Sequence, residues 1–139
     1  FKLLLITNFD YSFPEIDLEV VRWDVESEIE HLHRIDIGIY PLTLDEWSLG
    51  KGGLKVIQYM SIVIPSVSTN HGTACNIIED GINGFLVNSK HEWVERLKQL
   101  INDSELRERM GNLARKKAEV NYSINSTESK YLKVLDSLL

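Results

Sequence analysis

Short apolar runs alternate along the chain with segments of helical periodicity. Five runs predict strands, and the first, at residues 1–7, is nearly continuously apolar, which is typical of a strand buried on both faces. The runs are residues 1–7, 18–23, 35–42, 63–68 and 84–88. Strands that alternate with helices favour a mostly parallel sheet with right-handed crossovers, so the pattern predicts an α/β fold.

Helical periodicity fills the segments between and after these runs. Ile29 and Leu32 have helical spacing within residues 26–34, and another helix is predicted for residues 54–62. The clearest helix start is a capping box, in which Ser89 caps the helix and Glu92 reaches back to the cap amide. One apolar stripe follows it, made of Trp93, Val94, Leu97, Leu100 and Ile101.

Two further helices are predicted near the end of the chain. Residues 102–104 supply the cap of the first, in which Leu106, Met110 and Leu113 face inward. The basic run at residues 115–117 is predicted to be a solvated face. The last helix carries the apolar residues Tyr131, Leu132, Leu135, Leu138 and Leu139.

Composition and charge narrow the class of protein. Hydrophobic residues make up 43% of the 139 residues, which is enough for a packed core and argues against disorder. The formal net charge of −6 argues against a general nucleic-acid-binding protein. No apolar run approaches the ~20 residues of a transmembrane helix. The single cysteine, Cys75, fits a reducing, cytoplasmic compartment.

The first residues bear on domain organisation. Phe1 leads directly into an apolar run, whereas natural domains rarely begin in the middle of their core. We therefore expect residues 1–139 to form a single partial domain that is truncated on its amino-terminal side.

The most unusual stretch is LGKGGLKVIQYM, residues 49–60, which sets three glycines and two lysines around the start of a predicted helix. The loop leaves the carboxyl end of the third predicted strand, where α/β sheets bind ligands. The helix is expected to begin near Gly52 or Gly53, with first amides that have no intrahelical partner. These amides, together with Lys51, suit a phosphate or diphosphate. The order of residues is not that of a Walker P-loop.

Spacing adds a second candidate group. Lys51, Lys55 and Gln58 lie at i, i+4 and i+7, so they share one face if the helix extends that far back. Leu54, Ile57 and residues 60–61 then face the core. A polar amide such as Gln58, two turns from a phosphate site, suits ribose hydroxyls, while a solvated face behind a flexible loop explains the same pattern equally well.

Four motifs in order resemble one family. They are DIGIYPL (residues 36–42), EWSLGKGGLKVIQYM (46–60), EDGINGFLV (79–87) and SELRERMGNLAR (104–115). Together they resemble the carboxyl-terminal domain of group 1 retaining glycosyltransferases of GT-B architecture, in a bacterial variant with G-K-x-G-x-K before Q-Y-M. The resemblance implies a Rossmann-like, three-layer fold and a mostly parallel sheet, as the C-terminal half of the GT-B fold.

The resemblance also implies a function. Residues 1–139 would be the donor-binding part of a hexosyltransferase-type enzyme that moves a sugar from a UDP- or GDP-sugar to a glycan or lipid-linked acceptor, in cytoplasmic polysaccharide biosynthesis. It implies donor contacts from Lys51, Gly52, Gly53, Leu54 and Gln58, and no cofactor or metal. Catalytic residues and the acceptor site are expected in the missing amino-terminal domain, so the fragment alone is expected to be inactive. Peripheral membrane association of the full-length enzyme stays open.

One departure from the family keeps a second function open. Two glutamates that bracket the glycine loop in the wider family are replaced here by Gly50 and Gln58. The alternative is therefore a non-catalytic nucleotide- or phosphate-binding module, or a partner subunit, on the same fold. An upstream acceptor domain would favour the enzyme.

Five other residues are candidates for a site, a core or a surface position. Trp23 lies where the family receives the nucleotide base, but a core position is the preferred interpretation. Cys75 is predicted to be a small buried filler. Asp45 and the residue after it are interpreted as solvated loop acids. Among the histidines, only His71 falls at the expected ligand edge.

Overall fold

The computed structural model describes residues 1–138, apart from the side chain of Ser129. Leu139, which the sequence pattern assigns to the last helix, lies outside the described residues. The chain divides into two compact units, of which unit 1 is Phe1–Asp36 and unit 2 begins at Ile37.

Unit 1 is a parallel strand pair followed by a short helix. Strands β1 (Leu3–Thr7) and β2 (Leu18–Arg22) pair in parallel, and helix α1 (Glu28–Leu32) follows. Both predicted strands and the predicted helix are present. Trp23, directly after β2, is 43% exposed, so its interpretation as a core residue is wrong. A side chain at the end of a two-stranded edge has few neighbours to cover it.

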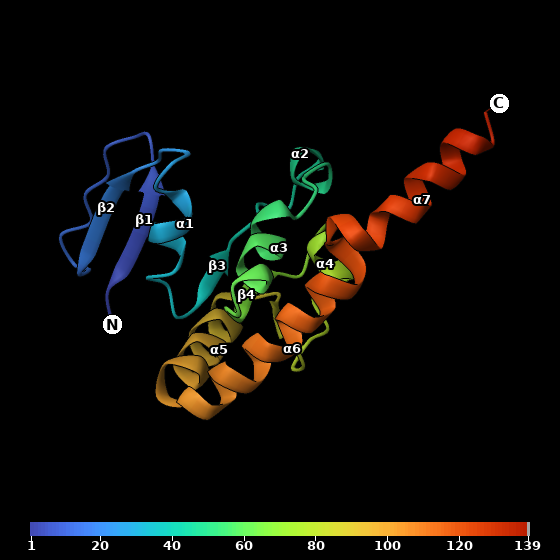
Figure 1. The fold of residues 1–139 in the computed structure, drawn as a ribbon. Coiled ribbons are helices and arrows are strands. Elements are labelled where there is room, and N and C mark those ends of the chain that lie inside the picture. The colour runs from blue at the N-terminus through green and yellow to red at the C-terminus, as the bar shows by residue number, and fades with distance from the viewer. Residues whose placement is uncertain (139) are drawn as a thin grey trace. The chain divides into compact units, whose positions relative to one another are not determined.

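Within residues 37–138, unit 2 contains a three-stranded parallel sheet and six helices, and Figure 1 shows their arrangement. The strand order is β3-β4-β5, and both pairings are parallel. The elements in chain order are β3 (Gly38–Tyr40), α2 (Glu46–Leu49), α3 (Leu54–Ser61), β4 (Ser66–Thr69), α4 (Ala74–Ile77), β5 (Gly84–Val87), α5 (Lys90–Asn102), α6 (Ser104–Tyr122) and α7 (Ile124–Asp136). The sequence pattern did not predict the short helices α2 and α4.

Two hydrophobic clusters cover opposite faces of this sheet. On β5, Leu86 packs against one cluster, while Phe85 and Val87 belong to the other. Successive strand residues point to opposite faces, so the two clusters lie on the two sides of the sheet. The first cluster is formed by α3, α4 and the second half of α6, and the other by α5 and the first half of α6. This arrangement confirms the predicted three-layer α/β fold.

The predicted cap of α5 is confirmed with one shift in detail. The Ser89 hydroxyl accepts a hydrogen bond from the Glu92 amide at 3.2 Å. The Glu92 carboxylate accepts from the Asn88 amide at 2.6 Å, one residue before the cap. The apolar stripe is narrower than predicted, because Val94 is 51% exposed and Ile101 is 37% exposed.

Helix α6 begins as predicted but turns a different face inward. The Asp103 carboxylate caps it by accepting from the Leu106 amide at 2.8 Å. Leu113 is 40% exposed, so its predicted core position is wrong, and Ala114 and Gly111 are buried instead. The reason is close packing: a Cβ on Gly111 would overlap the Val63 backbone carbonyl, so the backbones of α6 and of the turn after α3 lie in contact.

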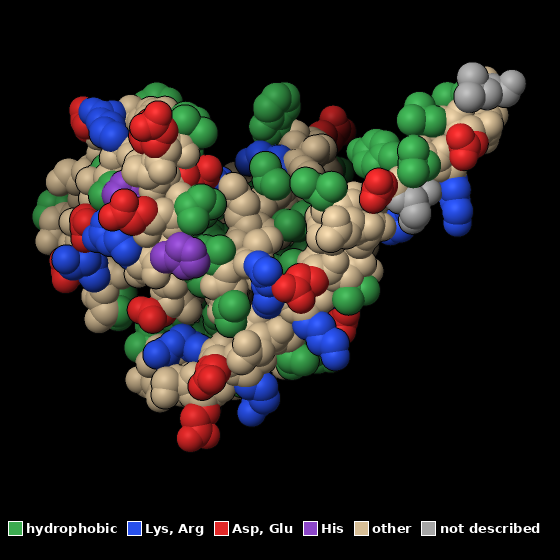
Figure 2. Space-filling view, viewed as in Figure 1, with side chains coloured by type: hydrophobic (Ala, Val, Ile, Leu, Met, Phe, Trp, Pro, Cys, Tyr) green, Lys and Arg blue, Asp and Glu red, His purple; other side chains and the backbone are tan. Residues whose placement is uncertain are grey.

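The surface of unit 2 carries one long apolar face. Helix α7 follows α6, leads away from it, and bears exposed hydrophobic side chains along its length (Figures 1 and 2). The basic run at residues 115–117 is only partly a solvated face, since Lys117 pairs with Glu79 at 2.7 Å.

Among residues 1–138, no helix combines the length and apolar character needed to cross a membrane.

Candidate functional site

The carboxyl ends of the three strands in unit 2 are joined by side-chain hydrogen bonds. The Thr69 hydroxyl, at the end of β4, accepts from the Leu42 amide at 2.9 Å and donates to the Leu42 carbonyl at 3.2 Å. The Asn70 amide group donates to the Asn88 side-chain oxygen, just past β5, at 3.0 Å. This edge therefore presents a connected set of loops, at the position where parallel α/β sheets bind ligands.

The glycine loop runs between two helices at this edge. Helix α2 ends at Leu49 with Gly50 as its C-cap, and the Lys51 amide still donates to the Ser48 carbonyl at 3.3 Å. Helix α3 begins at Leu54, with Gly53 as the residue before its first turn. Lys51 therefore precedes the helix, so the condition for a helical face shared by Lys51 and Gln58 is not met.

The amides at the start of α3 are the strongest chemical feature of the loop. Gly53 has no side chain to cap the helix, and its φ of +69° is in the left-handed region that favours glycine. Within the part of the chain that the structure describes, the amides of Gly52, Gly53 and Leu54 donate no hydrogen bond. Three amides without a protein acceptor lie at the positive end of a helix, next in the chain to Lys51, and such a group of donors stabilises an anion.

Gln58 lies one turn into α3. Its side-chain oxygen is shielded from solvent and accepts no hydrogen bond from residues 1–138. A shielded amide oxygen without a hydrogen-bond partner costs ~1–3 kcal/mol. The predicted core face of this helix is partly wrong, because Leu54 is 65% exposed while Val56 is fully buried.

Helix α2 is fixed by a cap that the sequence interpretation missed. The Asp45 carboxylate accepts from the Ser48 amide at 2.7 Å and from the Thr43 hydroxyl at 2.5 Å. The Thr43 hydroxyl and the Ser48 amide hold the pKa of Asp45 below its ordinary value of 3.8, and the Lys51 charge lowers it further. Asp45 is therefore a helix cap rather than a free loop acid. Aspartate is a preferred N-cap residue, so the identity of Asp45 was the signal that could have predicted this cap.

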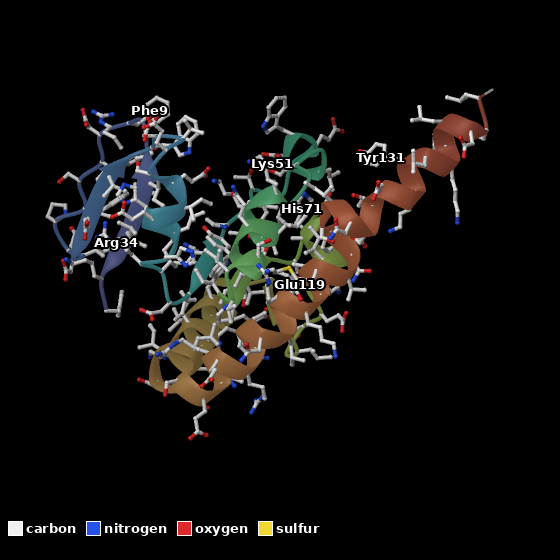
Figure 3. All side chains as sticks on the ribbon, in the orientation of Figure 1. Phe9, Arg34, Lys51, His71, Glu119 and Tyr131 are labelled. Carbon is white, nitrogen blue, oxygen red and sulfur yellow. The ribbon has the colours of Figure 1, made fainter. Side chains whose placement is uncertain are left out.

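The loop after β4 lies against α2. The carbonyl of Asp45 is 3.3 Å from the His71 ring nitrogen Nε2, and a carbonyl only accepts, so Nε2 donates. A Cβ on Gly72 would lie 3.1 Å from the Ser48 carbonyl. Figure 3 shows Lys51 and His71 at the α2 end of unit 2. Cys75 is half-buried and its thiol donates to Asn70 at 3.0 Å, so its interpretation as a buried filler is wrong.

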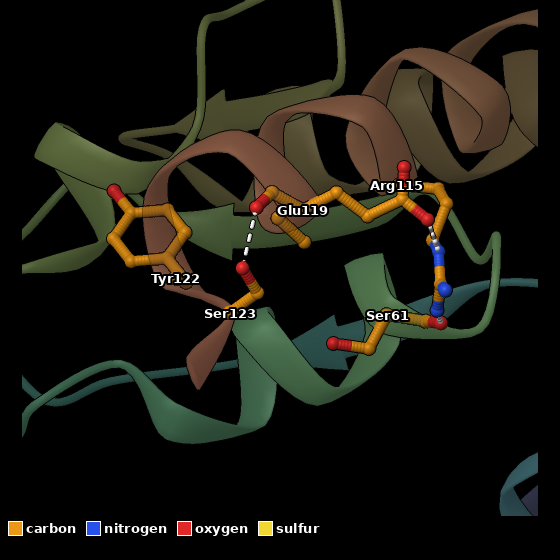
Figure 4. A pocket seen from close by; sticks show the side chains of 6 residues that line it. Ser61, Arg115, Glu119, Tyr122 and Ser123 are labelled. Carbon is orange, nitrogen blue, oxygen red and sulfur yellow. Dashed lines mark hydrogen bonds and ion pairs between the residues drawn. The ribbon is translucent and has the colours of Figure 1, made fainter. Parts of the chain in front are cut away.

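A small pocket lies at the other end of α3 (Figure 4). Its volume is about 100 Å³, below the ~300–1,000 Å³ of typical ligand sites. The Arg115 guanidinium on its wall already donates to the Ser61 carbonyl and to Glu119. Across residues 1–138, no group of three or more His, Cys, Asp and Glu side chains is placed to hold a metal ion.

Comparison with known sequences assigns most of the chain to one family. A profile of the family described as "Glycosyl transferases group 1" matches residues 19–117. One curated relative is the D-inositol 3-phosphate glycosyltransferase of Paenarthrobacter aurescens (strain TC1). It is 38% identical over 69 residues, which cover 48% of this chain and 17% of the relative. The chain spans 17% to 22% of the length of the curated relatives it matches.

Solved structures share the fold. The C-terminal domain of the glycosyl transferase group 1 family protein LpcC from Francisella tularensis superimposes with a TM-score of 0.65 at 25% identity, over 79% of this chain and 56% of that domain structure. Alr3699/HepE of Anabaena, solved in complex with UDP and glucose, has a TM-score of 0.73 at 17% identity, over 87% of this chain and 32% of that protein. The observed architecture is therefore that of the carboxyl-terminal half of GT-B enzymes.

Proposed function

Since this chain belongs to the group 1 glycosyltransferase family, we propose that unit 2 binds the nucleotide-sugar donor of a retaining glycosyltransferase. The reaction is transfer of a sugar from a UDP- or GDP-sugar to a glycan or lipid-linked acceptor. The observation that carries the proposal is the start of α3, where the amides of Gly52, Gly53 and Leu54 donate no hydrogen bond within the described residues.

The diphosphate is the part of the donor that this geometry suits. Its negative charge increases on the leaving oxygen as the sugar departs, and helix-start amides aimed at that charge stabilise the departing group. Lys51 adds a full positive charge next to these donors. Preorganised donors of this kind contribute roughly 3–4 kcal/mol each to a transition state.

The nucleoside is assigned to the next turn of the same helix. The unpaired Gln58 oxygen accepts from a ribose hydroxyl, and its amide nitrogen donates to a neighbouring one. This contact fixes the distance between ribose and diphosphate along α3. A UDP donor is supported by the complex of Alr3699/HepE with UDP and glucose, whose fold this chain shares.

The remaining parts of the proposal concern the full-length protein. We place the acceptor site and the catalytic groups outside residues 1–139, which by themselves are expected to show no turnover. The setting is cytoplasmic synthesis of a polysaccharide. The replacement of two family glutamates by Gly50 and Gln58 favours one competing function, a module that binds the nucleotide without catalysing transfer.

Calorimetric titration of the full-length protein with UDP and GDP tests the donor site. We expect Lys51→Ala to weaken the preferred nucleotide about 10- to 100-fold, because a hydrogen bond to a charged group is worth ~1.5–3 kcal/mol. The matched control is Lys116→Ala on α6, which should leave the affinity unchanged. Equal affinities for Lys51→Ala and the unmodified protein would refute the assigned role.

A second measurement separates the enzyme from the binding module. The matching nucleotide sugar is incubated with the full-length protein and candidate acceptors, and the anomeric configuration of any product is read by NMR. Retention of configuration supports the retaining transferase. The module is supported if the nucleotide binds tightly but the sugar is neither transferred to an acceptor nor slowly hydrolysed from the donor.

A further inference from the structure

We propose that His71 is a positioning residue that holds Lys51 at the diphosphate, a role that rests on the proposed function. His71 is in the loop after β4, and Lys51 is in the loop after β3. The link between them is the Asp45 carbonyl, which lies 3.3 Å from His71 Nε2. Because a carbonyl accepts only, the ring carries its proton on Nε2, and this hydrogen bond ties the two loops together.

The Asp45 carbonyl is the point at which α2 is anchored. It also accepts from the Leu49 amide at 3.3 Å, which is the helical hydrogen bond that closes α2. At the end of the same turn, the Lys51 amide donates to the Ser48 carbonyl at 3.3 Å. A displacement of the Asp45 carbonyl therefore moves the backbone from which the Lys51 side chain starts.

The second contact between the loops restricts movement in the same direction. Gly72, next to His71, has φ +59° and lies against the last turn of α2, where an added Cβ would be 3.1 Å from the Ser48 carbonyl and 3.5 Å from Leu49. Ser48 is fully buried beneath this contact. With the hydrogen bond from His71 at one end of α2 and Gly72 at the other, the turn has little freedom to shift.

This restraint matters because Lys51 has a long, flexible side chain. An error of about 1 Å in the placement of a charged group can cost on the order of 100-fold in rate. The cap formed by Asp45 holds α2 only to neighbouring residues of its own loop, whereas His71 ties α2 to the loop after β4. We therefore assign to His71 the role of fixing the distance between the Lys51 charge and the helix-start amides of α3.

The test uses three variants of the full-length protein: His71→Ala, His71→Gln and the control His91→Ala. Glutamine keeps an N–H near the position of Nε2. His91 is an exposed histidine on α5 that pairs with Glu95 at 3.3 Å. Calorimetry measures the affinity of each variant for two ligands. The first is the nucleoside diphosphate, UDP or GDP, that the unmodified protein binds, and the second is the matching nucleoside, which has no phosphate.

We expect His71→Ala to weaken the diphosphate about 3- to 10-fold, as the loss of one hydrogen bond implies, and to leave nucleoside affinity unchanged. His71→Gln should stay within about 2-fold, and so should His91→Ala. Adding His71→Ala to Lys51→Ala should cause no further loss, because coupled residues are not additive. Any of three results overturns the proposal. The His71→Ala variant binds the diphosphate as tightly as the unmodified protein, the two substitutions lower affinity independently in the double variant, or His71→Gln loses as much affinity as His71→Ala.

Hydrogen exchange without nucleotide separates this inference from the proposed function. The α2 amides should exchange faster in His71→Ala than in His91→Ala, whatever ligand the protein binds. Unchanged exchange overturns the positioning role even if the nucleotide binds. If exchange rises but Lys51→Ala binds the nucleotide normally, the donor-site proposal has failed, and the assignment of His71 to that site is overturned with it.

Discussion

The adjacent glycines Gly52 and Gly53 provide a sharp test of how the glycine loop is built. The perturbation is one methyl group, added by Gly53→Ala or by Gly52→Ala. At Gly53 the backbone has φ +69°, and an added Cβ would overlap the Ile77 Cδ1 atom. At Gly52 no atom lies within 4 Å of an added Cβ, and φ is not positive. Both variants therefore replace one glycine by alanine, but the two positions differ in backbone conformation and in the atoms that surround the added methyl group.

The expected difference follows from two terms. An L-residue in the left-handed region costs ~1–2 kcal/mol. Ile77 is 1% exposed, so its methyl group can move only into a less favourable rotamer, at ~1 kcal/mol. Gly53→Ala should therefore lower the free energy of unfolding by about 2–3 kcal/mol. Gly52→Ala should change it by no more than about 0.5 kcal/mol.

Urea unfolding followed by far-UV circular dichroism measures both values. At this chain length, ~1 kcal/mol moves the thermal midpoint by roughly 3 °C, so Gly53→Ala should also melt about 6–9 °C lower. If the two variants differ by less than about 0.5 kcal/mol, the left-handed turn and its contact with Ile77 do not determine this loop.

Two other predictions concern packing and acid stability. Gly111→Ala should lower the free energy of unfolding by ~1–3 kcal/mol through overpacking against the Val63 carbonyl. Asn112→Ala on the same helix should be neutral or stabilising, and equal melting temperatures for the two would contradict the contact. The lowered pKa of Asp45 means that its cap of α2 is fully present above its ordinary value of 3.8 and is lost as pH falls through the folded value. An NMR titration should show protonation of Asp45 below pH 3.8 and loss of protection at the Ser48 amide in the same step; a titration at or above 3.8 would exclude the cap.

Features of the loop that depend on local sequence could be predicted, and the orientation of α3 could not. Glycines around Lys51 before a helix were enough to predict unpaired amides. The position of Leu54 was predicted wrongly, since it is 65% exposed while Val56 is in the core. Helical spacing gives the relative positions of side chains on a helix, but only contact with α6 and the sheet decides which face turns inward.

The sequence alone determined the alternation of strands and helices, the cap at Ser89 and a second cap within residues 102–104, because periodicity and capping depend on residues within one or two turns of each other. Tertiary structure alone decided that Gly53 is constrained while Gly52 is not, and that His71 reaches the Asp45 carbonyl 26 positions away. Such contacts form between loops that the sheet brings together, and no local pattern records which atoms will meet there.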